Sequence, residues 1–166
     1  MSFPFPTDAR PAAPQGRRIA LICAKGGLDE CYPVLIMANA ARMTGIDTSI
    51  FFTFYGLDVV TESRVDKLWV NMVGNPASPM PPMIAGLPGM EALGTSFMRK
   101  KMAQLDLPGP REMITMLHES GARLYGCELA MRMFDRTEED LLPEIEAVIT
   151  ATDFFEMTAG ADIIFV

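Results

Sequence analysis

The sequence predicts an α/β protein in which a mainly parallel, five-stranded sheet lies between two layers of helices. Short apolar segments alternate with segments of helical character from residue 18 to the end of the chain. The apolar segments are nearly continuous, as in "RIALIC" at residues 18–23, and such strands belong to parallel sheets covered on both faces. Hydrophobic residues make up 49% of the 166 residues, enough for the core of one doubly wound α/β/α sandwich.

Five segments are expected to form strands because they are rich in β-branched, aromatic and other apolar residues. They lie at residues 18–23, 46–54, 122–127, 147–150 and 161–166. Gly26 and Gly27 follow the first strand, where a tight turn is expected. Ligand sites of such sheets lie beyond the carboxyl ends of the strands, so the residues that follow each strand are the first candidates for function.

Helices are expected between the strands, bounded by residues that favour helix ends. They cover residues 29–44, 56–70, 95–105, 110–120, 128–134, 138–145 and 151–160, the second of them with weak periodicity. Pro33 and Pro110 lie in first turns, where the missing N–H costs least. Gly45 and Gly121 follow the ends of two helices, where a left-handed residue commonly stands.

Two segments differ in composition from the rest of the single domain expected at residues 17–166. Residues 1–16 are rich in proline and predict a flexible N-terminal tail. Residues 74–95 combine Gly, Pro and Met, a mixture that argues against a regular helix or a central strand and predicts an inserted loop. The "MPPM" at residues 80–83 has a spacing that suits copper(I), although an adaptable apolar lid or interface explains its methionines more simply.

Charge and composition disfavour several functional classes. The formal net charge is -7, whereas nucleic-acid binding proteins usually present a basic surface. The chain has no uninterrupted apolar stretch of about 18 residues and no secretory signal, so we expect a cytoplasmic protein without an integral membrane span. Peripheral attachment to a membrane through the Met/Pro-rich loop is an open alternative. The three cysteines and the single His118 lack the paired spacing of a zinc site, and no metal or other cofactor is expected.

The segment "ALICAKGGLDECYP" at residues 20–33 resembles a phosphate-binding loop in outline only. A P-loop places a Lys and a Ser or Thr after its last glycine, but here Lys25 precedes Gly26 and Gly27. Asp29 and Glu30 would repel a phosphate at the start of the following helix. A nucleotide site is therefore disfavoured, while a site for a small anion at this turn, lined by Lys25 and Asp29, stays an alternative.

The cysteines offer a second kind of site. Cys127 lies where the third strand meets the next helix, and a helix N-terminus favours the reactive thiolate, although Glu128 opposes this effect. Cys23 ends the first strand, and in a sheet of order 2-1-3-4-5 it would face Cys127 across one gap. Cys31 lies near the start of the next helix. A small buried hydrophobic residue is the competing interpretation of each cysteine.

Several of these segments together resemble the DsrE/DsrF/DsrH-like family. The resemblance rests on "KGGLD" and "YP" in the first strand–turn–helix, on "FFTF" followed by "GL", on "YGCELAM", and on the closing "ATDFFEMTAGADIIFV", and it spans residues 18–166. It implies a flavodoxin-like fold and assembly as a homo-oligomer. One branch of the family is often labelled as peroxiredoxin, but the peroxidatic motif Thr/Pro-x-x-x-Thr/Ser-x-x-Cys is absent here.

The resemblance also implies a function in sulfur trafficking. The functional cysteine of the family corresponds to Cys127, which would accept and pass sulfane sulfur as a persulfide or thiosulfonate. TusA-like sulfur carriers and rhodaneses would be its partners. Relatives often carry another residue at the position of Cys23, and Cys31 lies outside the pattern. The alternatives are a non-catalytic interaction subunit of a sulfur-relay complex and a protein that binds a small anionic ligand.

Overall fold

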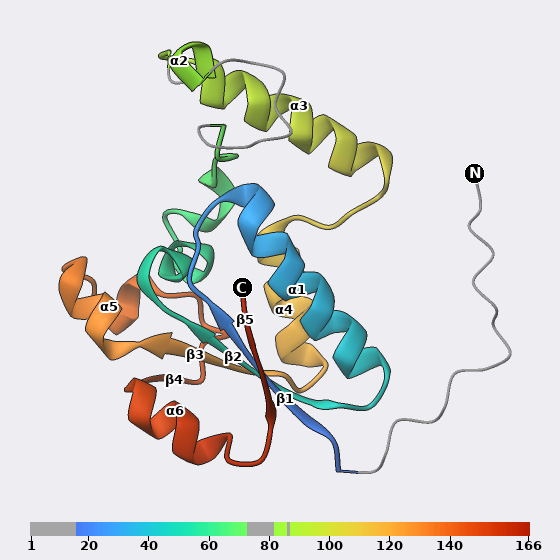
Figure 1. Ribbon diagram of the computed structural model, residues 1–166, viewed down its shortest axis with the longest axis vertical. Helices are drawn as coiled ribbons and strands as arrows, with labels where there is room; N and C mark the ends of the chain where they lie inside the picture. The colour runs from blue at the N-terminus through green and yellow to red at the C-terminus, as the bar shows by residue number, and fades with distance from the viewer. Residues whose placement is uncertain (1–15, 73–81, 86) are drawn as a thin grey trace, which may run out of the picture.

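A five-stranded, all-parallel sheet forms the centre of the computed structural model, which describes residues 16–72, 82–85 and 87–166 (Figure 1). The strands are β1 (Arg18–Cys23), β2 (Asp47–Phe52), β3 (Arg123–Cys127), β4 (Ala147–Ile149) and β5 (Asp162–Phe165). The expected three-layer α/β/α class is confirmed. The strand order is β4-β3-β2-β1-β5, so β2 lies between β1 and β3, unlike in the order 2-1-3-4-5.

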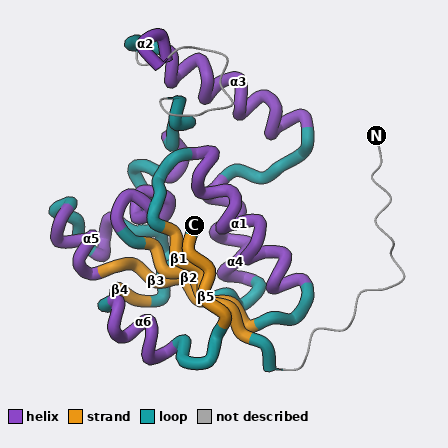
Figure 2. Tube along the Cα trace, viewed as in Figure 1, coloured by secondary structure: helices purple, strands orange, loops and turns teal. Residues whose placement is uncertain are grey.

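Helices cover both faces of this sheet (Figures 1 and 2). On one face, α1 (Leu28–Met43) packs against α4 (Pro110–Glu119), and on the other lie α5 (Glu128–Met133) and α6 (Ala151–Met157). Two further helices, α2 (Pro82–Ala85) and α3 (Met90–Gln104), lie beyond the carboxyl ends of the strands. Among the described helices, none has both the length and the apolar character that a bilayer span requires.

Three segments differ from the helical pattern of the sequence. Residues 56–70 form two 3₁₀ segments, η1 (Phe54–Val60) and η2 (Val65–Lys67), and residues 138–145 contain only η3 (Glu138–Asp140). Within the expected loop at 74–95, α2 forms and α3 begins at Met90. Gly89 makes this start possible, because its left-handed φ of 91° turns the chain into the helix. Residues 1–15 of the predicted tail at 1–16, and residues 73–81 and 86, lie outside the described residues.

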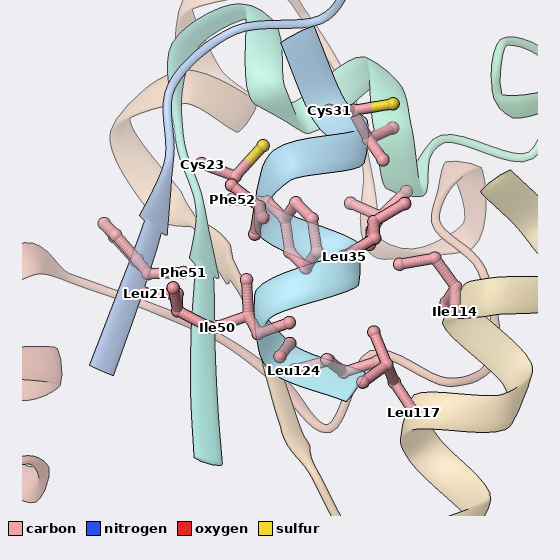
Figure 3. Packing of buried hydrophobic residues seen from close by; sticks show 14 of the residues in the cluster. Leu21, Cys23, Cys31, Leu35, Ile50, Phe51, Phe52, Ile114, Leu117 and Leu124 are labelled. Atoms are coloured by element: carbon pink, nitrogen blue, oxygen red, sulfur yellow. The ribbon is translucent and has the colours of Figure 1, made fainter. Parts of the chain in front are cut away.

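The side chains of the strands alternate between the two faces and build two halves of the core. Toward α1 and α4 point Ile50 and Leu124, which are paired in register (Figure 3). On the opposite face, Phe51 stacks on Phe154 of α6 with ring centroids 4.9 Å apart. This alternation fixes the side of the sheet on which each cysteine lies.

Candidate functional site

The loop that follows β1 and the loop that follows β2 pack closely against each other at the carboxyl edge of the sheet. A Cβ atom on Gly26 would lie 2.3 Å from the carbonyl oxygen of Tyr55, and one on Gly56 would lie 2.1 Å from that of Cys23. The amide of Thr53 also donates a hydrogen bond to the Cys23 carbonyl, at 2.9 Å. The close packing of these loops therefore explains the glycine at position 26 without a phosphate.

A cavity of about 710 Å³ opens beside this turn. Lys25, Gly26 and Gly27 line it, as three of the four expected ligand-binding residues. The fourth, Asp29, does not line it, but its Oδ1 accepts a hydrogen bond from the backbone amide of Asn71, a lining residue, at 3.1 Å. The remaining lining residues come from the first turn of α1, from η1, from the chain around η2 and from the start of helix α3: Glu30, Tyr55, Asp58, Arg64, Lys67, Leu68, Trp69, Val70, Asn71 and Glu91.

Sequence reasoning missed the cationic and aromatic side chains of this cavity. The sequence predicts a helix over the segment 56–70, which contains Arg64, Lys67 and Trp69, and this prediction does not direct their side chains to the carboxyl edge. The signal that was present is Trp69, a large apolar residue beside charged ones and 51% exposed in the structure.

Cys127 lies at the strand–helix junction that the sequence predicts. It is the last residue of β3 and the N-cap residue of α5, and 5% of its surface is exposed. It does not line the 710 Å³ cavity. The η1 segment separates the two, since Tyr55, which lines the cavity, packs on Phe134 just after α5 with centroids 5.5 Å apart.

The expected juxtaposition of Cys23 and Cys127 is wrong. Strand β2 lies between β1 and β3, and the alternation of side chains places Cys127 with Tyr125 on the α6 face. Cys23 is paired in register with Phe52, on the α1 face. Its neighbour there is Cys31 of α1 (Figure 3).

The environment of Cys23 and Cys31 keeps both thiols protonated. Burial raises the pKa of Cys23 to about 12, and the backbone of Lys25 only partly offsets this effect. The Sγ of Cys23 donates a hydrogen bond to the Lys25 carbonyl oxygen at 3.5 Å, a contact that only the protonated thiol can make. Burial, and then the proximity of Cys23, raises the pKa of Cys31 as well. Neither thiol has the environment of a reactive cysteine, which needs a stabilised thiolate and access.

Known proteins resemble this chain over almost its whole length. The family model described as the DsrE/DsrF/DrsH-like family matches residues 15–166. The "Sulfur carrier protein DsrE2" of Allochromatium vinosum is 31% identical over 155 residues, covering 89% of this chain and 96% of that protein. The uncharacterized protein YrkE of Bacillus subtilis is 24% identical, covering 92% and 98%. A solved structure of MTH1491, a protein of unknown function from Methanobacterium thermoautotrophicum, has a TM-score of 0.50 at 13% identity, covering 90% and 99%, and shares the fold.

Proposed function

This chain belongs to the DsrE/DsrF/DrsH-like family, and from that premise we propose that it is a sulfur carrier that holds sulfane sulfur on Cys127. The observation that carries the proposal is the contrast among the three cysteines. All three cysteines are buried: Cys23 and Cys31 have 1% and 0% exposure and raised pKa values, and Cys127 has 5% exposure at a strand–helix junction on the carboxyl edge. The name of the relative from Allochromatium vinosum supports the same reaction class.

The proposed step is thiol exchange without net oxidation. The Cys127 thiolate attacks the outer sulfur of a donor persulfide, R–S–SH, and forms a new S–S bond. The S–S bond of the donor breaks, and its thiolate R–S⁻ leaves with the electron pair. Transfer to an acceptor thiolate reverses these events, and a thiosulfonate on Cys127 is a second form of the carried sulfur. Because Cys127 is 5% exposed, loading requires a local movement of α5 or η1.

The surface beside Cys127 supports docking of a protein partner. Leu129 and Met133 stand one turn apart on α5 and are 64% and 50% exposed. A TusA-like carrier or a rhodanese would dock here in the cytoplasm, and the chain itself would form a homo-oligomer. In this proposal Lys25, Gly26 and Gly27 bind ligand in the cavity, and Asp29 holds its wall through Asn71.

The test is sulfur loading followed by mass spectrometry. The wild-type protein and the single variants Cys127→Ser, Cys23→Ser and Cys31→Ser are treated with polysulfide and then digested. We expect added sulfur on the Cys127 peptide, loss of loading in Cys127→Ser, and retained loading in the other two variants. Equal loading of wild type and Cys127→Ser would refute the proposal.

A second candidate function is a non-catalytic interaction subunit of a sulfur-relay complex. The observation that favours it is the burial of Cys127, since 5% exposure limits direct contact with a donor. A thiol probe separates the two candidates. If Cys127 in the folded protein resists the probe as fully as Cys23, the interaction subunit is favoured over the carrier.

A further inference from the structure

The cavity at the carboxyl edge has the size of a site for an organic molecule. Its volume of about 710 Å³ falls within the range of roughly 300–1,000 Å³ that is typical of small-molecule sites. An inorganic anion would occupy a small part of it. The cavity also lies on the far side of η1 from Cys127, so carriage of sulfur on that thiol does not account for it.

The charged residues of this cavity divide into paired and unpaired groups. The Lys25 ammonium lies 3.6 Å from the Glu30 carboxylate, and Asp58 binds the guanidinium of Arg136. The other charged lining residues have no ion-pair partner in the described part of the chain: Arg64, Lys67 and Glu91. Two cations and one carboxylate therefore remain to meet charges of a ligand.

Each unpaired group suits a particular ligand group. The guanidinium of Arg64 can bind a carboxylate with two parallel hydrogen bonds, and the ammonium of Lys67 can meet a second anionic group as a point charge. The carboxylate of Glu91, in the first turn of α3, can accept hydrogen bonds from an ammonium group. A ligand with two carboxylates and one ammonium group mirrors this pattern.

Trp69 supplies an apolar contact within the cavity. Trp69 is 51% exposed, although two hydrogen bonds hold the peptide group that joins it to Val70. The carbonyl oxygen of Trp69 accepts a hydrogen bond from the amide of Leu28 at 2.8 Å. The amide of Val70 donates to the hydroxyl of Thr95 at 2.9 Å. A fixed, half-exposed tryptophan beside unpaired cations is well suited to cover the aliphatic part of a ligand.

We propose that this cavity binds a small zwitterionic organic molecule that carries two carboxylates and one ammonium group. Arg64 and Lys67 bind the carboxylates, Glu91 binds the ammonium group, and Trp69 contacts the chain between them. The assignment goes beyond sulfur carriage, because it needs no reaction at Cys127.

Tryptophan fluorescence tests the proposal directly, since Trp69 is the one tryptophan in the sequence. The probe is S-methylglutathione, which keeps the three charges and cannot exchange sulfur with a cysteine. We expect a saturable change of fluorescence, matched by calorimetry, and weakening of about tenfold in Arg64→Gln, as expected for the loss of a charged hydrogen-bonded contact of about 1.4 kcal/mol. Lys67→Gln and Glu91→Gln should weaken binding severalfold.

Controls distinguish this site from general electrostatics and from the sulfur chemistry. Lys100→Gln removes an exposed cation of α3 that does not line the cavity, and it should leave the affinity unchanged. Cys127→Ser should bind the probe as the wild type does, so that loss of sulfur loading and loss of probe binding are separate outcomes. Absence of saturable binding, unchanged affinity in Arg64→Gln, or equal affinity for sulfate or for the dimethyl ester of the probe would overturn the proposal.

Discussion

Alkylation of the folded protein should reach Cys127 well before it reaches Cys23 or Cys31. The pKa of Cys23 is raised from 9.0 to about 12, so at pH 8 about one thiol in 10⁴ is ionised, against about one in ten for an unshifted thiol. A more basic thiolate is a better nucleophile. With a Brønsted coefficient of about 0.45, the raised pKa increases the intrinsic reactivity of the thiolate by a factor of about 20. The raised pKa alone therefore slows the alkylation of Cys23 by about 50-fold relative to an unshifted thiol.

Access adds to this difference. Cys23 is 1% exposed at the end of β1, within the core beneath α1, so reagent reaches it only through a large opening of the fold. Cys127 is 5% exposed and is followed by a helix of six residues, so a local opening exposes it. Access therefore slows the alkylation of Cys23 beyond the 50-fold effect of its raised pKa.

Pulse alkylation with iodoacetamide measures the rate at each cysteine. The protein is labelled at pH 8, quenched, unfolded, and mapped by mass spectrometry. In denaturant, all three cysteines should react at similar rates, which shows that the folded environment causes the difference. Labelling of Cys23 in the folded protein at a rate similar to that of Cys127 would refute both the assigned burial and the contrast on which the carrier proposal depends.

Three further predictions concern stability. Cys23 holds its proton more tightly in the folded chain than in the unfolded chain. Its contribution to the free energy of unfolding is therefore present below pH 9 and is lost between pH 9 and 12, at about 1.4 kcal/mol per pH unit. Cys23→Ala should therefore flatten the decline of the urea midpoint at alkaline pH. Phe154→Ala removes a fully buried ring stacked at 4.9 Å and should lower the free energy of unfolding by about 3–5 kcal/mol. The control Phe155→Ala, at a half-exposed neighbour, should lower it by less than about 1 kcal/mol in the same assay. Equal losses would contradict the placement of α6. Gly56→Ala places a methyl group 2.1 Å from a backbone oxygen and should cost about 1–3 kcal/mol, measured by thermal unfolding, and an unchanged Tm would show that the two loops can separate.

The positions of the strands could be predicted from the sequence because each is a short apolar run bounded by turn residues. The β1 segment, for example, begins and ends at the predicted residues Arg18 and Cys23. The order of the strands could not, since an apolar strand fits a central position beside several neighbours equally well. The wrong prediction that Cys23 faces Cys127 follows from the strand order, which the sequence does not determine.

The candidate site was predicted in part for a similar reason. The glycine turn and the junction at Cys127 are set by local sequence, so their places at the carboxyl edge follow once the strands are known. Arg64, Lys67 and Trp69 reach the edge through the 3₁₀ geometry of η1 and η2, which tertiary contacts select over the α-helix that the sequence suggests. Local propensity carries little information about that choice.

Because β2 lies between β1 and β3, the cavity and Cys127 lie on opposite sides of η1 at the carboxyl edge of the sheet. In the order 2-1-3-4-5, the loops after β1 and β3 would be adjacent, and a ligand at the glycine turn would lie against the thiol at the end of β3. Here η1 stands between them, with Tyr55 packed on Phe134 and Asp58 bound to Arg136. The η1 segment thus borders both the cavity and Cys127. A ligand in the cavity that moves η1 therefore changes the packing around Cys127 without contacting it. Ligand binding and sulfur loading should therefore be measured separately on the same variants, because either function can be lost while the other is retained.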